Sequence, residues 1–223
     1  NGYGAVNDNG EPCLLLPGYE PRQTEHWLRM EVLLERIRAT IKGRVPVALV
    51  VDCVKSRRNW RMGILVNQWQ ERLRDLVDGL ALDNLIVLSS AGPNQINEYS
   101  STLKSTVFGH FLRLGLAGHA DRVFDTDMNL GGNNDGTVSA AELEVYLRLK
   151  VGEWTRINRA DVQIPELLNF DNKHFPLVSS LNRRAVKRLE SLPDAQNSSA
   201  VSLASVTNLW KTLDGFRTTE RIR

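Results

Sequence analysis

The sequence predicts an α/β protein with three layers, in which a mostly parallel sheet lies between helices on both faces. Helical and strand-like patterns alternate from Trp27 to Leu168, which is typical of strands joined by helical crossovers. Two short apolar runs, 47–51 and 85–88, have the length and branched composition of strands that are buried on both faces. A small helical extension is expected at the C-terminal end of the chain.

Four segments carry the apolar spacing of three and four residues that marks one face of a helix. The stripes consist of Trp27, Met30, Leu34, Ile37 and Ile41; of Leu65, Trp69, Leu73, Leu76 and Leu80; of Val107, Phe108, Phe111 and Leu112; and of Leu143, Leu147, Val151 and Trp154. A last strand-like piece runs over 162–168. Functional sites in such sheets lie beyond the carboxyl ends of the strands, which here selects 52–60 and 89–101.

The character of the chain changes near residue 170. We expect one domain over 1–170, and a helical extension or the start of another domain over 171–223. The stretch 203–217 carries more apolar surface than a free tail leaves exposed; its apolar residues are Leu203, Val206, Leu209, Trp210, Leu213 and Phe216. The chain opens with Asn1 instead of Met, so we interpret it as a segment of something longer.

Composition excludes several classes of protein. Apolar residues make up 42% of the chain and charged residues 24%, and no apolar run approaches the roughly 18 residues of a membrane helix. The formal charge of +2 argues against a surface built for nucleic acid or anionic lipid. Two cysteines are too few for a disulfide framework, which fits a reducing compartment such as the cytoplasm.

A series of short motifs resembles the caspase-like cysteine peptidases, in particular bacterial relatives of the metacaspases that form one part of multidomain chains. In chain order the motifs are GYGAVNDNG at 2–10 with CLLLP at 13–17, VVDCVKS at 50–56, LSSAGPNQ at 88–95, TVF at 106–108, DGTVSAAEL at 135–143 and QIP at 163–165. The resemblance covers about residues 1–168. It implies a caspase-like α/β/α fold whose first strands lie upstream of Asn1.

The resemblance places the catalytic histidine position at Tyr3 and the catalytic cysteine position at Val54. Peptidases of this class need a thiolate as nucleophile and an imidazole to transfer protons. A phenol with an ordinary pKa of about 10 is a poor base near neutral pH, and valine has no lone pair. We therefore expect a pseudo-peptidase that serves as a binding or scaffolding module in a larger protein, with a peptide segment or a protein as its partner.

Cys53 lies one residue before the expected nucleophile position. The alternative hypothesis is therefore an active cysteine endopeptidase with Cys53 as its nucleophile. Adjacent strand residues point to opposite faces, so Cys53 would replace Val54 only through a local bulge. Such an enzyme also needs a base, and no histidine stands at the family position; the histidines are His26, His110, His119 and His174. The other interpretation of Cys53 is a buried structural thiol.

The expected cleft is lined by Asp52, Lys55, Ser90 and Asn94, and its rim is formed by 55–61 and 89–101. The first rim loop is basic and contains one aromatic residue; its members are Lys55, Arg57, Arg58, Trp60 and Arg61. This loop either contacts an anion or an acidic peptide, or is a solvated loop before a helix. Asn94 stands where the resemblance implies an acidic residue that selects Arg or Lys, so this selectivity is expected to be lost.

The stretch 125–142 resembles an EF-hand calcium loop, and its candidate ligands are Asp125, Asp127, Asp135 and Glu142. With Gly136 as the sixth position of such a loop, two carboxylates are missing from their places, so we expect at best weak calcium binding and no other cofactor. A structural interpretation competes: Ser139 and Glu142 have the spacing of a capping box, and Asp135-Gly136 that of a turn.

Overall fold

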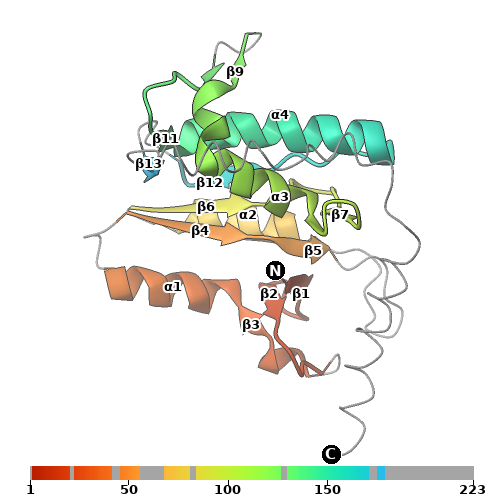
Figure 1. Ribbon diagram of the computed structural model, residues 1–223. Coiled ribbons are helices and arrows are strands. Elements are labelled where there is room, and N and C mark those ends of the chain that lie inside the picture. Colours follow the sequence, from red (N-terminus) through yellow and green to blue (C-terminus); the bar gives the residue numbers. More distant parts are fainter. Residues whose placement is uncertain are drawn as a thin grey trace, which may run out of the picture.

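A three-stranded sheet in the order β12-β6-β4 lies between helices on both of its faces (Figure 1). β4 (Val47–Val51) runs parallel to β6 (Leu85–Ser89), and β12 (Glu166–Leu168) runs antiparallel to β6. The structure is a computed structural model, and it describes residues 2–20, 23–41, 46–55, 68–80, 84–126, 130–170 and 175–178.

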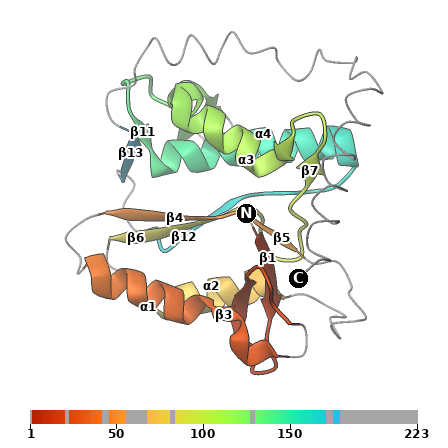
Figure 2. The same ribbon diagram turned by 60° about the horizontal axis from the view of Figure 1, so that its bottom comes forward.

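A second sheet, in the order β3-β2-β1-β5, adjoins the first sheet where β5 follows β4 (Figure 2). Its strands are β1 (Gly2–Val6), β2 (Pro12–Leu15), β3 (Leu28–Arg29) and β5 (Cys53–Lys55). β1 and β2 form an antiparallel hairpin, and β1 pairs in parallel with β5. Because β5 follows β4 after the single residue Asp52, the two sheets share one long strand.

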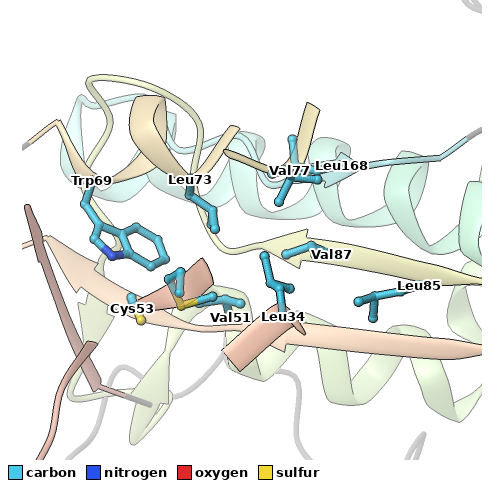
Figure 3. Packing of buried hydrophobic residues seen from close by; sticks show 10 residues of the cluster. Leu34, Val51, Cys53, Trp69, Leu73, Val77, Leu85, Val87 and Leu168 are labelled. Atoms are coloured by element: carbon cyan, nitrogen blue, oxygen red, sulfur yellow. The ribbon is translucent and has the colours of Figure 1, made fainter. Parts of the chain in front are cut away.

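One face of this strand is covered by α1 (Met30–Ile41) and α2 (Trp69–Gly79). The buried cluster beneath them consists of Met30, Leu34, Val51, Cys53, Trp69, Leu73, Val77, Leu85, Val87 and Leu168 (Figure 3). The predicted apolar stripes are confirmed here for the described residues, except that α1 begins three residues after Trp27; Leu65, the first residue of the second stripe, lies outside the described residues. Trp27 packs instead with Ala5, Cys13 and Leu15 of the hairpin.

α3 (Val107–Leu114) and α4 (Ala140–Arg159) lie on the opposite face of the sheet, over β6. The Thr106 hydroxyl accepts a hydrogen bond from the Gly109 amide and caps α3. Ser139 and Glu142 form the predicted capping box at the start of α4. The buried cluster here consists of Leu88, Val107, Phe108, Ala120, Val138, Leu143, Tyr146, Leu147 and Val151.

Short elements complete the described part of the chain. β7 (Tyr99–Ser100) pairs with β8 (Ser105–Thr106), β9 (Phe124–Asp125) with β10 (Leu130–Gly131), and β11 (Val138–Ser139) with β13 (Pro176–Val178). Phe175 is buried against Ile86 and Ala140, so residues 175–178 pack on the preceding fold. The predicted amphipathic stretch 203–217 lies outside the described residues.

The α/β class is as predicted, but the direction of β12 differs from the expected mostly parallel sheet. The reason lies in the helices before it. α3 begins at the carboxyl end of the sheet, where Thr106 bonds to Asp52, and α4 ends there, where Arg159 bonds to Tyr99. Two helical passes therefore return the chain to the end at which β6 stopped, and the next strand has to run in the opposite direction.

The prediction that 47–51 is buried on both faces is wrong for one face. Val51 is 5% exposed, whereas Val50 is 41% exposed and Ala48 is also exposed. Alternate strand residues face opposite sides, so the exposed residues both face the side of α3 and α4. Described elements cover that side of β6, but they leave the outer part of β4 open.

Among the described residues, no helix combines the length and the apolar character that a membrane crossing requires.

Candidate functional site

The strands β1 and β5 bring together two residues that are far apart in the sequence. Their parallel register sets Tyr3 opposite Val54, with Gly2 opposite Cys53 on one side and Gly4 opposite Lys55 on the other. Tyr3 is 53% exposed. The two positions that the resemblance assigns to a catalytic pair are therefore neighbours across a strand pair, and the residues found there are a tyrosine and a valine.

Close packing of the hairpin against α2 fixes the position of β1. The indole N–H of Trp69 donates a hydrogen bond of 2.9 Å to the backbone oxygen of Cys13. A Cβ atom at Gly4 would lie 2.6 Å from the Trp69 ring, closer than real Cβ contacts, so only glycine lets β1 approach α2 this closely. The packing of Gly4 against Trp69 therefore fixes the backbone next to Tyr3.

Cys53 points away from solvent, into the core beneath α1 and α2 (Figure 3). Its side chain packs with Val51, Trp69 and Leu73, and the residue is 5% exposed. Burial, together with the nearby charge of Asp52, raises the pKa of the Cys53 thiol to about 12. A thiol with this pKa is protonated near neutral pH and is a poor nucleophile.

Asp52, predicted to line a cleft, is buried on the opposite face of the strand. Its carboxylate accepts a hydrogen bond of 2.5 Å from the Asn97 side-chain amide and one of 2.7 Å from the Thr106 hydroxyl. Thr106 also caps α3 through Gly109. This carboxylate therefore ties the end of β4 to the loop after β6 and to the first turn of α3.

Gln163 extends the same network to the C-terminal end of α4. Its side-chain amide donates to the Asn97 side-chain oxygen at 3.0 Å and to the Ser90 backbone oxygen at 2.8 Å. Its own side-chain oxygen accepts from the Glu98 amide at 3.0 Å. The network is buried and its polar groups satisfy one another, which favours a single arrangement of the loops at this end of the sheet.

The remaining predicted cleft residues lie in different surroundings. Ser90 is 2% exposed, and its backbone amide bonds to Val51. Asn94 is exposed on the loop after β6, where its backbone N–H donates a hydrogen bond to a carboxylate oxygen of Glu71 on α2. Lys55 ends β5, and the basic loop that follows, with Arg57, Arg58, Trp60 and Arg61, lies outside the described residues.

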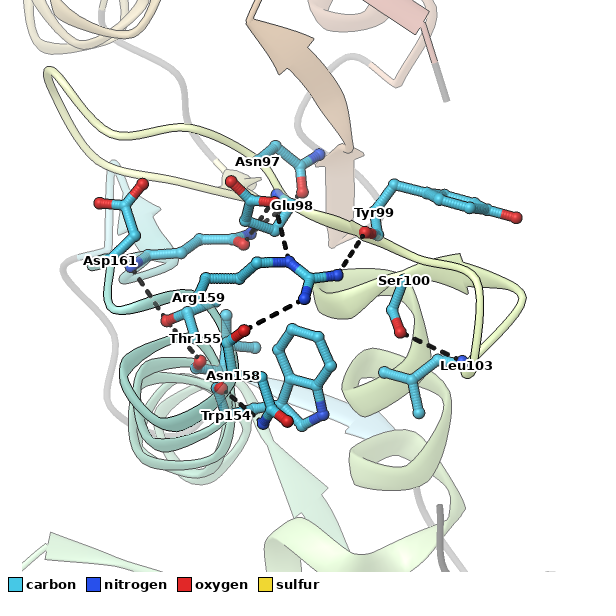
Figure 4. Close-up of polar contacts among 12 residues, drawn as sticks. Asn97, Glu98, Tyr99, Ser100, Leu103, Trp154, Thr155, Asn158, Arg159 and Asp161 are labelled. Atoms are coloured by element: carbon cyan, nitrogen blue, oxygen red, sulfur yellow. Dashed lines mark hydrogen bonds and ion pairs between the residues drawn. The ribbon is translucent and has the colours of Figure 1, made fainter. Parts of the chain in front are cut away.

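A charged contact borders the network on its solvent side (Figure 4). The Arg159 guanidinium lies 3.5 Å from a Glu98 carboxylate oxygen, donates to the Tyr99 backbone oxygen, and stacks 5.1 Å from the centre of the Trp154 ring. Tyr99 itself is 54% exposed. Arg159 therefore holds the loop after β6 against the end of α4 and leaves an aromatic ring at the surface.

The described histidines occupy packing and surface positions. His26 lies in the exposed helical turn before Trp27. The ring of His110 meets Phe111 edge to face, and the ring of His119 lies beside Tyr146. His174 is outside the described residues.

In the calcium-like loop, carboxylates bind the chain's own amides. Asp121, which the sequence analysis did not single out, accepts bonds from the Asp135 and Gly136 amides at 3.0 and 3.1 Å. The Glu142 carboxylate accepts hydrogen bonds from the backbone N–H of Asn133 and from the backbone N–H and the hydroxyl of Ser139. Hydrogen bonds from Thr137 and Asn133 hold the pKa of Asp135 below its usual value.

Two glycines allow this loop to pack closely against the backbone at Asp121. Gly131 has a φ of 125°, and a Cβ on Gly132 would lie 2.2 Å from the Asp121 carbonyl carbon. Asp125 lies on β9, and Asp127 is outside the described residues. In the part of the chain that the structure describes, no three potential ligand side chains gather as for a metal ion. Calcium binding stays a prediction.

Sequence reasoning placed Asp52 in the site but did not predict its partners Asn97 and Thr106, nor Gln163, which bonds to Asn97. Thr106 carried a signal, because a threonine directly before an apolar helical stripe is a common cap. Asn97 lies in the expected rim loop 89–101 and Gln163 in the motif QIP, but an amide side chain in the sequence does not indicate its distant partner.

Comparison with known proteins gives no assignment: no family model, no curated protein and no solved structure matches this chain.

Proposed function

We propose that this chain is a caspase-like domain without peptidase activity, a pseudo-peptidase that binds a peptide segment or a protein partner within a larger protein. The site for the partner is the surface around Tyr3, at the carboxyl end of the shared strand. The loop after β6 forms one side of it.

The register between β1 and β5 carries the proposal. The motifs that contain Tyr3 and Val54 are about fifty residues apart in the sequence. A cysteine peptidase needs its histidine and its cysteine side by side. Tyr3 and Val54 are register partners on parallel strands. This agreement supports the assignment of the histidine and cysteine positions to Tyr3 and Val54. Neither a phenol nor an isopropyl group can act as the base or the nucleophile of a cysteine peptidase, so the proposal expects no catalytic pair.

The surroundings of Cys53 argue against the alternative peptidase. A bulge that exchanged Cys53 with Val54 would interrupt the alternation of faces along the strand. Val51 and Cys53 both pack beneath α1 and α2, and Asp52 between them bonds on the other face. The alternation is therefore continuous up to Cys53, and its thiol has a pKa of about 12.

The surface around Tyr3 has properties that suit binding. An exposed tyrosine provides a large, stiff contact area at low entropic cost, and such rings are frequent in protein interfaces. It sits on a backbone held by the contact between Gly4 and Trp69. The buried network from Asp52 to Gln163 fixes the neighbouring loops.

The first test separates binding from cleavage on the same chain. We would incubate the folded chain with a mixed peptide library, identify retained peptides by mass spectrometry, and look for cleaved products in the same sample. The proposal expects retained and uncleaved peptides. It also expects Cys53 to resist peptidyl thiol-directed inhibitors until the chain is unfolded.

Two matched variants locate the binding surface. Tyr3→Arg should weaken the affinity for a retained peptide by roughly tenfold or more, as loss of an interface aromatic does. Tyr19→Arg changes another exposed tyrosine, after β2, and should leave the affinity unchanged. Equal affinity in both variants would place the binding surface elsewhere.

Cleavage that is lost in Cys53→Ala and kept in Cys13→Ala would establish the peptidase and end the proposal.

A further inference from the structure

An apolar pocket of about 240 Å³ lies on the side of the sheet that carries α3 and α4. β4 and β6 line it from the sheet, and Leu112 of α3, Leu143 of α4 and Leu177 of β13 line it from the other elements. Val50 of β4 borders the pocket and is 41% exposed, although its neighbour Val51 is 5% exposed. The described elements therefore leave part of the pocket wall in contact with solvent.

The chemistry of the pocket selects an apolar occupant. The described residues that line it are all alanine, valine, isoleucine or leucine, so a polar ligand would find no side-chain hydrogen-bond partner there. The pocket is also smaller than the range of about 300–1,000 Å³ that is usual for small-molecule sites. A space of this size and chemistry fits one or two large apolar side chains, such as a polypeptide supplies.

The C-terminal part of the sequence contains suitable side chains. The stretch 203–217 has apolar residues at spacings of three and four, including the aromatic residues Trp210 and Phe216, and it has few charges. The earlier stretch 181–192 is less suitable, because basic residues interrupt its apolar ones. These basic residues are Arg183, Arg184, Lys187 and Arg188.

The described chain ends beside the pocket. Leu177 lines it, and Val178, the last described residue, pairs with Val138 of β11. The 24 residues 179–202 connect this point to Leu203. A flexible chain of that length has a root-mean-square reach of about 27 Å. A tether of this kind gives the attached segment an effective concentration on the order of 1 mM, so even a weakly binding segment can occupy the pocket.

We propose that the apolar pocket between α3 and the sheet is the docking site of the chain's own C-terminal stretch 203–217, which inserts apolar side chains beside Val50. The site adds to the surface around Tyr3 and does not depend on the proposed function. The docked form exceeds the free form by roughly tenfold, which corresponds to about 1.4 kcal/mol. The contact therefore adds little to the stability of the whole fold.

Methyl NMR spectra of the full chain test the contact from the side of the pocket. An indole ring in or beside the pocket shifts the signals of neighbouring methyl groups, so Trp210→Ser should move the signals of Val50 and Leu177. Lys211→Ser changes the next residue along the chain and should leave them in place. The methyl signals of Leu34, in the core beneath α1 and α2, report on folding and should not move in either variant.

Trypsin tests the contact from the side of the C-terminal stretch, because Lys211 lies within it. Val50→Asp places a carboxylate at the pocket rim and should speed cleavage after Lys211 by roughly tenfold, since cleavage follows the population of the undocked form. Val162→Asp changes another exposed valine, which is 52% exposed, and should leave the rate unchanged. If Val50→Asp unfolds the chain, the NMR comparison still decides.

Several outcomes would overturn the proposal. Pocket signals that do not respond to Trp210→Ser would do so, and so would equal cleavage rates in Val50→Asp and the wild-type chain. Shifts caused by Leu189→Ser instead would assign the pocket to 181–192, and shifts that depend on protein concentration would assign it to a second copy. Either result would exclude the C-terminal stretch of the same chain as the occupant.

Discussion

The two faces of the strand formed by β4 and β5 have different surroundings, although its residues are almost uniformly apolar. On one face, Val51 and Cys53 lie in a filled core beneath α1 and α2. On the other face, Val50 borders an open pocket and Asp52 enters a buried polar network. The same strand therefore borders a filled core on one face, and a pocket and a polar network on the other.

The apolar run 47–51 predicts that the strand is buried, but it does not specify which helices or strands cover each face. The filled face is completed by helices close in sequence, α1 before the strand and α2 after it. The other face is completed only in part by α3 and α4. Changes on the two faces should therefore alter the stability of the fold by different amounts.

Trp69→Ala should lower the free energy of unfolding by about 4 kcal/mol, the range for truncation of a large buried aromatic residue. Trp69 is 2% exposed and also bonds to Cys13, so both packing and a hydrogen bond are lost. Urea unfolding followed by circular dichroism measures the loss. Tyr19→Ala, at an exposed aromatic residue, is the control and should change little; a Trp69 loss below about 1 kcal/mol would contradict the filled core.

Asp52→Ala should lower the free energy of unfolding by about 3 kcal/mol, because Asn97 and Thr106 lose their acceptor in a buried site. The same urea titration measures it. Asp75→Ala provides the comparison, since the Asp75 side chain is 68% exposed. Similar values for the two variants would mean that the network does not stabilise this end of the sheet.

The two cysteines predict a loss of stability at alkaline pH. Burial raises the pKa of Cys53 from 9.0 to about 12, so the folded chain keeps the proton that the unfolded chain releases. This contribution is complete below pH 9 and declines as the pH rises toward 12, by about 1.4 kcal/mol per pH unit. The stability difference between the wild-type chain and Cys53→Ala should therefore shrink between pH 9 and pH 10.

Cys13→Ala serves as a second variant for this experiment. The pKa of Cys13 is raised to about 11 by burial and by the charge of Glu11, so its contribution should end at lower pH than that of Cys53. A pH-independent difference for both variants would mean that the thiols titrate alike in the folded and unfolded chains.

The last comparison concerns neighbouring residues on the two faces of β4. Val51→Ala should cost about 2 kcal/mol, whereas Val50→Ala should stay within about 0.5 kcal/mol. The exposed fractions of 5% and 41% give the reason. Thermal unfolding of both variants would measure the contrast, and an equal cost would show that Val50 is covered in solution.

Local patterns made much of the fold predictable. The helical stripes, the two apolar strands and the capping box of Ser139 and Glu142 all follow from spacings within a few residues. The Asp135-Gly136 turn is also present, with Gly136 at a φ of 87°. In each case the deciding interactions lie between near neighbours in the chain.

The rest depended on contacts between distant segments. The partners of Asp52 come from the loop after β6 and the start of α3, and the open face of β4 depends on which elements reach it. Periodicity does not encode either feature. The parallel register that sets Tyr3 opposite Val54 likewise joins segments about fifty residues apart, and no local pattern encodes it.

The number of helical passes between β6 and β12 decides which residues can meet. Because α3 and α4 make an even number, Gln163 returns to the end of the sheet that holds Asp52 and Asn97. An odd number would make β12 parallel and carry Gln163 to the far end, with the same residues in the same sequence order. The shared polar network therefore depends on the even number of helices between β6 and β12. One inserted or deleted helix between these strands would abolish the network, even if all of its side chains were kept.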